Sequence, residues 1–133
     1  MKTAYIMRGL PGSGKSTVAR QIAENRLSTI HSTDNFFMVN GEYQFNPSKL
    51  REYHAKNLAA FTKSCEDNTP VVICDNTNTQ EWEYEQYIKA AEENGYCVAI
   101  VKMKHPSTIV AAERNTHGVP LEAILRMLSR FED

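Results

Sequence analysis

Residues 9–16 carry the residue types and spacing that could do chemistry most directly. They read Gly-Leu-Pro-Gly-Ser-Gly-Lys-Ser and follow a short apolar run over residues 3–7. This is the GxxxxGK[ST] pattern of a phosphate loop, in which glycines let backbone N–H groups converge on a phosphate chain. Lys15 supplies a positive charge near the outer phosphates, and the Ser16 hydroxyl can hold Mg²⁺. The predicted residues for binding ATP with Mg²⁺ are Gly9, Pro11, Gly12, Ser13, Gly14, Lys15, Ser16 and Thr17.

Two aspartates are predicted to lie near this loop. Asp34 follows a short predicted strand over residues 28–31, and Asp75 ends the apolar run over residues 71–74. The carboxylate of Asp34 can accept the proton of an attacking hydroxyl, and we predict it to be the catalytic base. In phosphate-loop proteins an acidic residue at the end of an apolar strand binds Mg²⁺ or its coordinated water, and Asp75 has this position. Asp34 could instead cap the turn that follows it, because Asp-Asn is common in turns.

Further polar residues are candidates for the same site. Three of them follow the second aspartate directly: Asn76, Thr77 and Asn78. Their side chains can hydrogen-bond a phosphate or an acceptor, although polar residues before a helix also form turns without any function. Arg114 lies in a polar segment over residues 114–118, where it could close over the phosphates and neutralise transition-state charge. The alternative for Arg114 is a solvated surface arginine.

Short apolar runs and stretches with helical spacing alternate along the chain, which is typical of an α/β protein. Strands are predicted over residues 3–7, 28–31, 71–74 and 96–103. The last of these runs lacks a clean alternation, which favours a strand covered on both faces of a parallel sheet. We therefore expect a three-layer P-loop kinase fold with a mainly parallel sheet of four or five strands. Its ligand is expected at the carboxyl ends of the strands.

Helices are predicted between and after these strands. One follows the phosphate loop, and one begins at Asn46-Pro47 and ends near residues 67–70. Asn78 and Glu81 resemble a capping pair for the next helix. A brief helix is expected after Ser107. Pro120 restarts a last helix, whose apolar face is expected to dock on the sheet through Leu121, Ile124, Leu125 and Leu128.

Composition restricts the class of protein. The 133 residues predict one compact domain over residues 1–133, and 15 Lys and Arg against 16 Asp and Glu give a net charge of −1. Proteins that bind long nucleic acid usually carry an excess of positive charge, which this chain does not have. A few local cations could still bind a polynucleotide end. Three cysteines without metal spacing predict reduced thiols in a cytoplasmic protein. No apolar run approaches a membrane span, so the sequence predicts no membrane contact, and it leaves the oligomeric state open.

Five motifs occur in the order and spacing of one known family. They are residues 9–17, Asp34, residues 75–78, residues 114–115 and residues 119–120. Over nearly the whole chain they resemble the kinase domain of polynucleotide 5′-hydroxyl kinases. The most similar branch occurs in animal ubiquitin-ligase-binding proteins, on residues 34–37, 43–47, 75–79 with Trp82, and 117–119.

This resemblance implies phosphoryl transfer from ATP to the 5′-OH end of single-stranded DNA or RNA. It implies that Asp34 is the general base, that Lys15 and Arg114 contact the phosphates, and that Ser16 holds Mg²⁺. Residues 114–119 would form a lid, and residues 35–67 would form a small acceptor segment. The chain could work alone or be the kinase unit of a larger assembly.

The chain departs from this family just after Asp34. The polynucleotide kinases usually have an arginine there to contact the acceptor strand, whereas this chain has Phe36 and Phe37. An aromatic side chain could stack on a nucleobase, so Phe37 joins the predicted acceptor-binding residues, which are otherwise Asp75, Asn76, Thr77 and Asn78. The aromatic residues could equally pack within the acceptor segment.

Two other functions stay open. A small-molecule or nucleoside kinase would use the same loop and Asp34 on a smaller alcohol, and the near-neutral net charge slightly favours it. An ATP-binding switch or partner-binding module with little catalysis is the second alternative. Asp34 and Arg114 argue against that module, because a pure binder needs neither residue.

Overall fold

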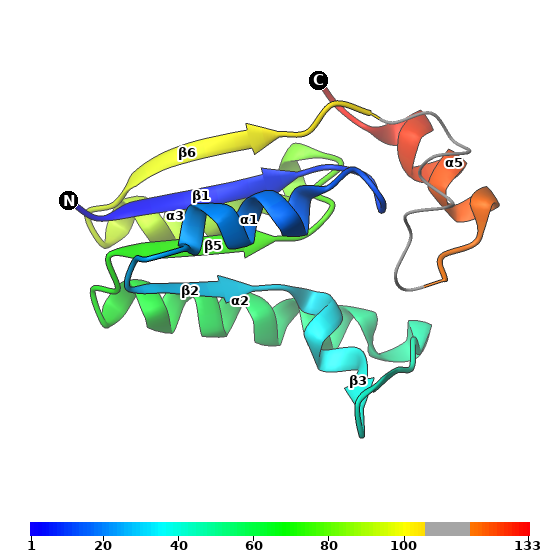
Figure 1. Ribbon diagram of the computed structural model, residues 1–133, viewed down its shortest axis with the longest axis horizontal. Coiled ribbons are helices and arrows are strands. Elements are labelled where there is room, and N and C mark those ends of the chain that lie inside the picture. The colour runs from blue at the N-terminus through cyan, green and yellow to red at the C-terminus, as the bar shows by residue number, and fades with distance from the viewer. Residues whose placement is uncertain (106–117) are drawn as a thin grey trace.

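A parallel β-sheet forms the middle layer of the molecule (Figure 1). The computed structural model describes residues 1–105 and 118–133. Among these residues the sheet has four strands, in the order β2-β5-β1-β6. The strands are β1 (Thr3–Arg8), β2 (Ser28–His31), β5 (Val71–Asp75) and β6 (Cys97–Lys102). Because every pair in this sheet is parallel, the carboxyl ends of the strands meet at one edge.

Helices cover both faces of this sheet (Figure 1). Helix α1 (Lys15–Ala23) packs on one face, and α2 (Leu50–Glu66) and α3 (Glu81–Glu93) pack on the other. The core on the α1 side contains Met7, Ala19, Val71 and Ile73, and the opposite core contains Ala4, Ile6, Phe61, Val72, Tyr87 and Ala91. The central strand β5 is buried at every position, which explains its unbroken apolar sequence. The predicted three-layer α/β fold is confirmed.

A small unit lies between β2 and α2. It consists of the 3-10 helix η1 (Thr33–Phe37), the strands β3 (Met38–Val39) and β4 (Glu42–Tyr43), and the 3-10 helix η2 (Pro47–Lys49). Asn40 and Gly41 join β3 to β4 with φ values of 51° and 83°, as a tight hairpin turn requires. Two-residue strands are too short to show a hydrophobic period, so the sequence analysis did not predict this hairpin.

The predicted capping pair of α3 is wrong. The N–H of Gln80 donates to Glu83 Oε2 at 3.1 Å, and the N–H of Glu83 donates to the carbonyl of Gln80 at 2.9 Å. Asn78 lies two residues before this cap, has a φ of 48°, and donates to the carbonyl of Met7 at 2.7 Å. The Asn78 side chain is therefore used to fasten its loop to β1, and Gln80 and Glu83 cap the helix.

Two expectations about the C-terminal part are also wrong. β6 is an edge strand and its Ile100 is 49% exposed, so it is not covered on both faces. Helix α5 (Leu121–Arg130) lies beyond the carboxyl ends of the strands instead of on a face of the sheet (Figure 1). It buries Ile124 completely but leaves Leu121 and Leu125 about half exposed.

The helix expected after Ser107 falls outside the described residues. No helix that the structure describes has the length and apolar character to cross a bilayer.

Arg8 is the last residue of β1, and it binds the segment after α5 to the carboxyl ends of the strands. Its side chain is buried, and it donates to the carbonyls of Asn78 at 2.8 Å, Thr79 at 3.1 Å and Glu132 at 2.6 Å. Its guanidinium carbon also lies 4.8 Å from the ring centroid of Phe131. A buried charge with three carbonyl partners holds the start of the phosphate loop in place.

We expect Arg8→Met to lower the free energy of unfolding by about 3 kcal/mol, because three carbonyl oxygens lose a charged donor. Urea denaturation would measure this change. The matched control is Arg51→Met on the exposed surface of α2, which should change stability by under about 0.5 kcal/mol. Equal effects of the two substitutions would contradict the structural role of Arg8.

Candidate nucleotide-binding site

The loop between β1 and α1 depends on its glycines. Gly12 and Gly14 have φ values of 80° and 89°, in the left-handed region that favours glycine. Gly9 is needed for space, because a Cβ there would lie 2.5 Å from Ser13 Oγ and 3.0 Å from Met103 Cβ. Gly14 caps α1 without a side-chain hydrogen bond, which leaves the first N–H groups of the helix available to an anion.

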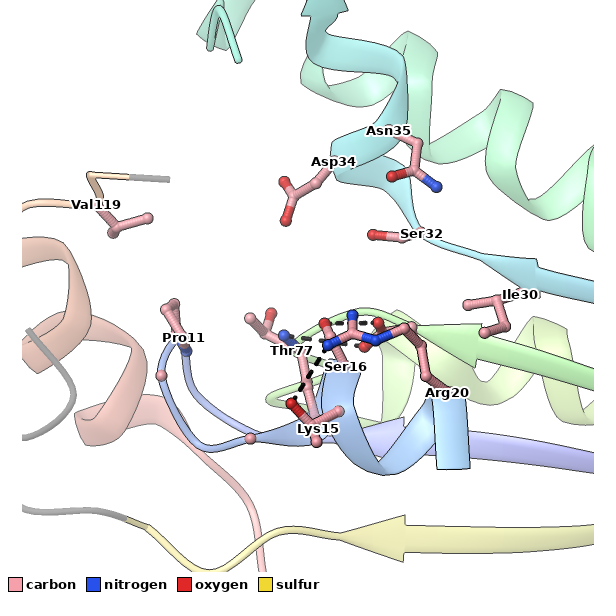
Figure 2. A pocket seen from close by; sticks show the side chains of 14 residues that line it. Pro11, Lys15, Ser16, Arg20, Ile30, Ser32, Asp34, Asn35, Thr77 and Val119 are labelled. Atoms are coloured by element: carbon pink, nitrogen blue, oxygen red, sulfur yellow. Dashed lines mark hydrogen bonds and ion pairs between the residues drawn. The ribbon is translucent and has the colours of Figure 1, made fainter. Parts of the chain in front are cut away.

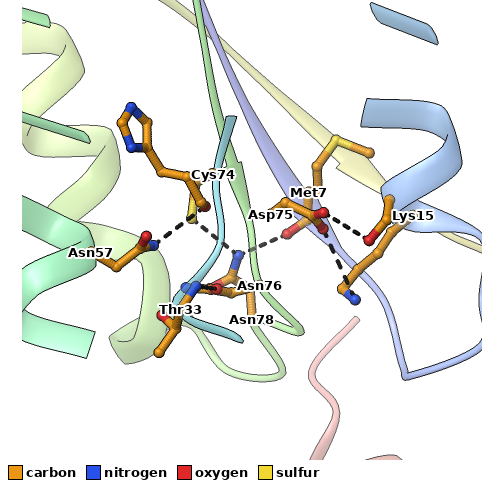
Figure 3. A network of polar contacts seen from close by, with 10 residues as sticks. Met7, Lys15, Thr33, Asn57, Cys74, Asp75, Asn76 and Asn78 are labelled. Atoms are coloured by element: carbon orange, nitrogen blue, oxygen red, sulfur yellow. Dashed lines mark hydrogen bonds and ion pairs between the residues drawn. The ribbon is translucent and has the colours of Figure 1, made fainter. Parts of the chain in front are cut away.

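Lys15, Ser16 and Asp75 form a polar cluster beside the loop. Figure 3 shows the Lys15 side chain directed toward Asp75. Ser16 Oγ donates to Asp75 Oδ2 at 2.8 Å, and Lys15 Nζ lies 3.9 Å from Asp75 Oδ1. Two buried polar atoms here, Asp75 Oδ1 and Ser13 Oγ, have no hydrogen-bond partner among the described residues. A hydroxyl beside a carboxylate with a spare oxygen matches the hard oxygen ligands that Mg²⁺ prefers. The residues present therefore fit a magnesium ion that accompanies nucleotide phosphates.

A pocket of about 520 Å³ opens over this cluster (Figure 2). The loop and α1 form one side of it, and the residues that follow β2 form the other. It is lined by Pro11, Gly12, Gly14, Lys15, Ser16, Thr17, Arg20, Ile30, Ser32, Asp34, Asn35, Asp75, Thr77 and Val119. The structure thus brings the phosphate loop, both predicted aspartates and Thr77 to a single pocket.

Asp34 lies in η1 and reaches the pocket from the wall opposite the loop (Figure 2). The hydroxyl of Tyr43 donates to Asp34 Oδ1 at 3.2 Å. Burial, together with the charge of Asp34 and this hydrogen bond, raises the pKa of Tyr43, so the phenol stays a donor at neutral pH. The sequence analysis did not place Tyr43 at the site, since only the β3–β4 hairpin brings it back to Asp34.

Three of the predicted acceptor-binding residues make contacts within the protein and do not line the pocket. Asn76 Oδ1 accepts a hydrogen bond from the Thr33 N–H at 2.9 Å (Figure 3). Asn78 is 2% exposed and bonds to β1 as described above. Phe37 is 1% exposed, and its ring centroid lies 4.7 Å from that of Tyr53. The structure therefore supports packing of Phe37 over stacking on a base. Of the predicted acceptor set, Asp75 and Thr77 line the pocket.

The remaining catalytic prediction, Arg114, falls outside the described residues. From the predicted lid over residues 114–119, Val119 lines the pocket. Arg20 also lines it, and the sequence analysis missed this residue. The signal that could have found Arg20 is its spacing from Thr17, because residues three apart share one face of a helix.

Comparisons with known proteins agree with this geometry. The profile of the AAA domain family matches residues 5–133. Human NEDD4-binding protein 2 is 38% identical over 144 residues, which covers 98% of this chain and 8% of that protein. A chain in the structure of the Pnkp1/Rnl/Hen1 RNA repair complex has a TM-score of 0.76 at 20% identity, covering 98% of this chain and 44% of that one. Kti12 from Chaetomium thermophilum, in complex with ADP-AlF3, has a TM-score of 0.71 at 16% identity, covering 98% and 80%.

These matches confirm the resemblance that the motifs indicate. The structural similarities are below 25% identity and show the fold alone. The chain spans under a tenth of the length of NEDD4-binding protein 2. The profile match covers almost the whole chain, including the phosphate loop and both aspartates. The chain belongs to the AAA domain family and has a nucleotide-binding, P-loop kinase-like fold.

Proposed function

We propose that this protein is an ATP-dependent kinase that transfers the γ-phosphoryl group to the 5′-OH end of a polynucleotide. The observation that carries the proposal is the position of Asp34 across one pocket from Lys15 and Ser16 (Figure 2). Asp75 lines the same pocket. A nucleotide-binding module needs the phosphate loop and its acid, but it does not need a second carboxylate facing them.

The donor side of the pocket suits the phosphates of ATP. Backbone N–H groups at the start of α1 can bind them, and the Lys15 ammonium group can neutralise their outer charge. Ser16 Oγ and Asp75 would hold Mg²⁺, which supplies charge neutralisation when bound. Arg114 is proposed to add positive charge from the lid over residues 114–119.

The acceptor side suits a hydroxyl group. In the proposed reaction the hydroxyl oxygen forms a bond to the γ-phosphorus, the bond to the β-phosphate oxygen breaks, and ADP leaves. Asp34 takes the proton of the hydroxyl, and Tyr43 orients its carboxylate through the hydrogen bond to Oδ1. The segment over residues 35–67 is proposed to surround the acceptor.

The choice of a polynucleotide end rests on the family motifs, and the similarity to a chain of an RNA repair complex agrees with it. A cytoplasmic location is part of the proposal, and it agrees with three cysteines that form no disulfide: Cys65, Cys74 and Cys97.

Lys15→Ala should reduce phosphoryl transfer by roughly 10²-fold or more, because the charge on the outer phosphates loses its ammonium partner. The measurement is transfer from labelled ATP with Mg²⁺. Lys89→Ala, on the exposed surface of α3, is the matched control and should retain wild-type turnover. A wild-type rate for Lys15→Ala would exclude the proposed site.

Asp34→Asn should cut transfer by roughly 10²-fold or more, since an amide cannot take the proton of the hydroxyl. ATP affinity, measured by calorimetry with Mg²⁺, should stay unchanged. Asp67→Asn is the control, because this exposed aspartate lies at the end of α2, away from the pocket. Equal losses of affinity and turnover in Asp34→Asn would indicate a structural role instead.

The acceptor is tested by incubating the protein with labelled ATP, Mg²⁺ and three kinds of acceptor: 5′-OH oligonucleotides, nucleosides and simple alcohols. We expect the highest kcat/KM with the oligonucleotides. Transfer only to the small alcohols would favour the small-molecule kinase. Nucleotide binding without any transfer would favour the ATP-binding module.

A further inference from the structure

We propose that residues 131–133, which follow α5, position the start of the phosphate loop and the turn after β5 for nucleotide binding. The docking of this segment and the binding of nucleotide then stabilise each other. Phe131 and Glu132 are the positioning residues, and neither lines the pocket, so they act through the residues that they contact. The inference rests on the nucleotide-binding part of the proposed function and does not depend on the acceptor.

Glu132 joins three elements at the carboxyl ends of the strands. Its N–H donates to the carbonyl of Thr79 at 2.7 Å, and its carbonyl accepts from Arg8 Nη2 at 2.6 Å. Its side-chain Oε1 accepts from the N–H of Glu81, the first residue of α3, at 2.6 Å. One residue thus links β1, the turn after β5 and α3, which are all far from it in the sequence.

Phe131 packs against the charged group of Arg8. The guanidinium carbon lies 4.8 Å from the ring centroid of Phe131 and 4.8 Å from that of Tyr84. Arg8 is 4% exposed, and within the described part of the chain it has no ion pair with a carboxylate. A buried cation is costly unless other groups replace its water, and here aromatic rings and carbonyl oxygens do so. Removal of the Phe131 ring should therefore loosen the contacts of Arg8.

The contacts of Arg8 lead directly to groups that line the pocket. Gly9 follows Arg8 in the chain, and its N–H donates to the carbonyl of Thr77 at 3.0 Å. Thr77 lines the pocket and precedes Asn78 and Thr79, whose carbonyls accept from Arg8. A displacement of Arg8 would therefore move the start of the phosphate loop together with the turn that carries Thr77.

The position of α5 depends on the same contacts. Arg130, the last residue of α5, donates from Nε to Thr79 Oγ1 at 3.3 Å. Val119 lies two residues before this helix and lines the pocket, at the same end as Pro11 of the phosphate loop (Figure 2). A ligand binds more tightly when the walls around it are already in place. By linkage, bound nucleotide should favour the docked segment by the same factor.

The first test measures the Kd for MgATP by calorimetry, well below the unfolding temperature. Phe131→Ala removes the ring beside Arg8, and Glu132→Pro removes the N–H that Thr79 binds. Each substitution should raise this Kd by roughly 5- to 50-fold, the usual range for coupled sites. Phe131→Tyr keeps the ring and Glu132→Gln keeps the N–H and the side-chain oxygen, so both should bind MgATP like the wild-type protein.

The second test measures the reverse coupling by hydrogen exchange in the wild-type protein. Saturating MgATP should slow exchange of the Glu132 N–H several-fold, because nucleotide favours the docked segment. The Asn68 N–H, bonded to the Cys65 carbonyl in the turn after α2, is the comparison and should not change. A segment with a merely structural role would exchange at the same rate with and without nucleotide.

Tyr96→Phe is the matched control for a loss of stability. It removes a hydrogen bond of 2.7 Å to the Thr69 carbonyl at the opposite end of the sheet, and it should leave the Kd for MgATP unchanged. The inference is overturned if Phe131→Ala and Glu132→Pro bind MgATP like the wild-type protein, if the conservative variants lose as much affinity, if Tyr96→Phe weakens binding equally, or if nucleotide leaves Glu132 exchange unchanged. The proposed function survives each of these results. If the wild-type protein bound no MgATP, the proposed function and the inference would both be overturned.

Discussion

The parallel pairing of β1 with β5 is the constraint on which the site depends. In this register Met7 lies opposite Asp75, so the end of β5 comes level with the start of the phosphate loop. Ser16 can then reach Asp75 at 2.8 Å. A slip of one residue would turn Asp75 to the other face of the sheet. Two further bonds fix the register, from the Gly9 N–H to the Thr77 carbonyl at 3.0 Å and from Asn78 to Met7.

Many polar residues around the pocket make hydrogen bonds between the segments that form its walls, and their side chains do not face the pocket. Asn76 joins the loop after β5 to the N–H of Thr33, and His54 Nδ1 lies 3.0 Å from Thr33 Oγ1. The wall that carries Asp34 is thereby tied to the sheet and to α2. Arg8 fixes the start of the phosphate loop through its hydrogen bonds to the carbonyls of Asn78, Thr79 and Glu132. Because the two walls are held independently, the distance between the donor and acceptor sides is set by the scaffold.

The sequence predicted well those features that are local in the chain. The phosphate loop, the run before Asp75 and the helix from η2 through α2 each have a short-range signal, and the structure has them at the predicted places. The errors concern features that depend on distant neighbours. Asn78 looked like a helix cap because its attachment to Met7, on another strand, is invisible in the local pattern. Likewise, the apolar run in β6 does not reveal that this strand lies at an edge.

The sequence by itself determined the chemistry of the loop, because three closely spaced glycines, a lysine and a serine act through backbone conformation and charge within a few residues. It also determined the α/β class, because hydrophobic period is a local property. Only the tertiary structure decided which polar residues face the pocket. Thr77 and Arg20 line it while Asn78 and Phe37 do not, and Tyr43 meets Asp34. Such outcomes follow from strand order and hairpin folding, which bring together residues that are far apart in the chain.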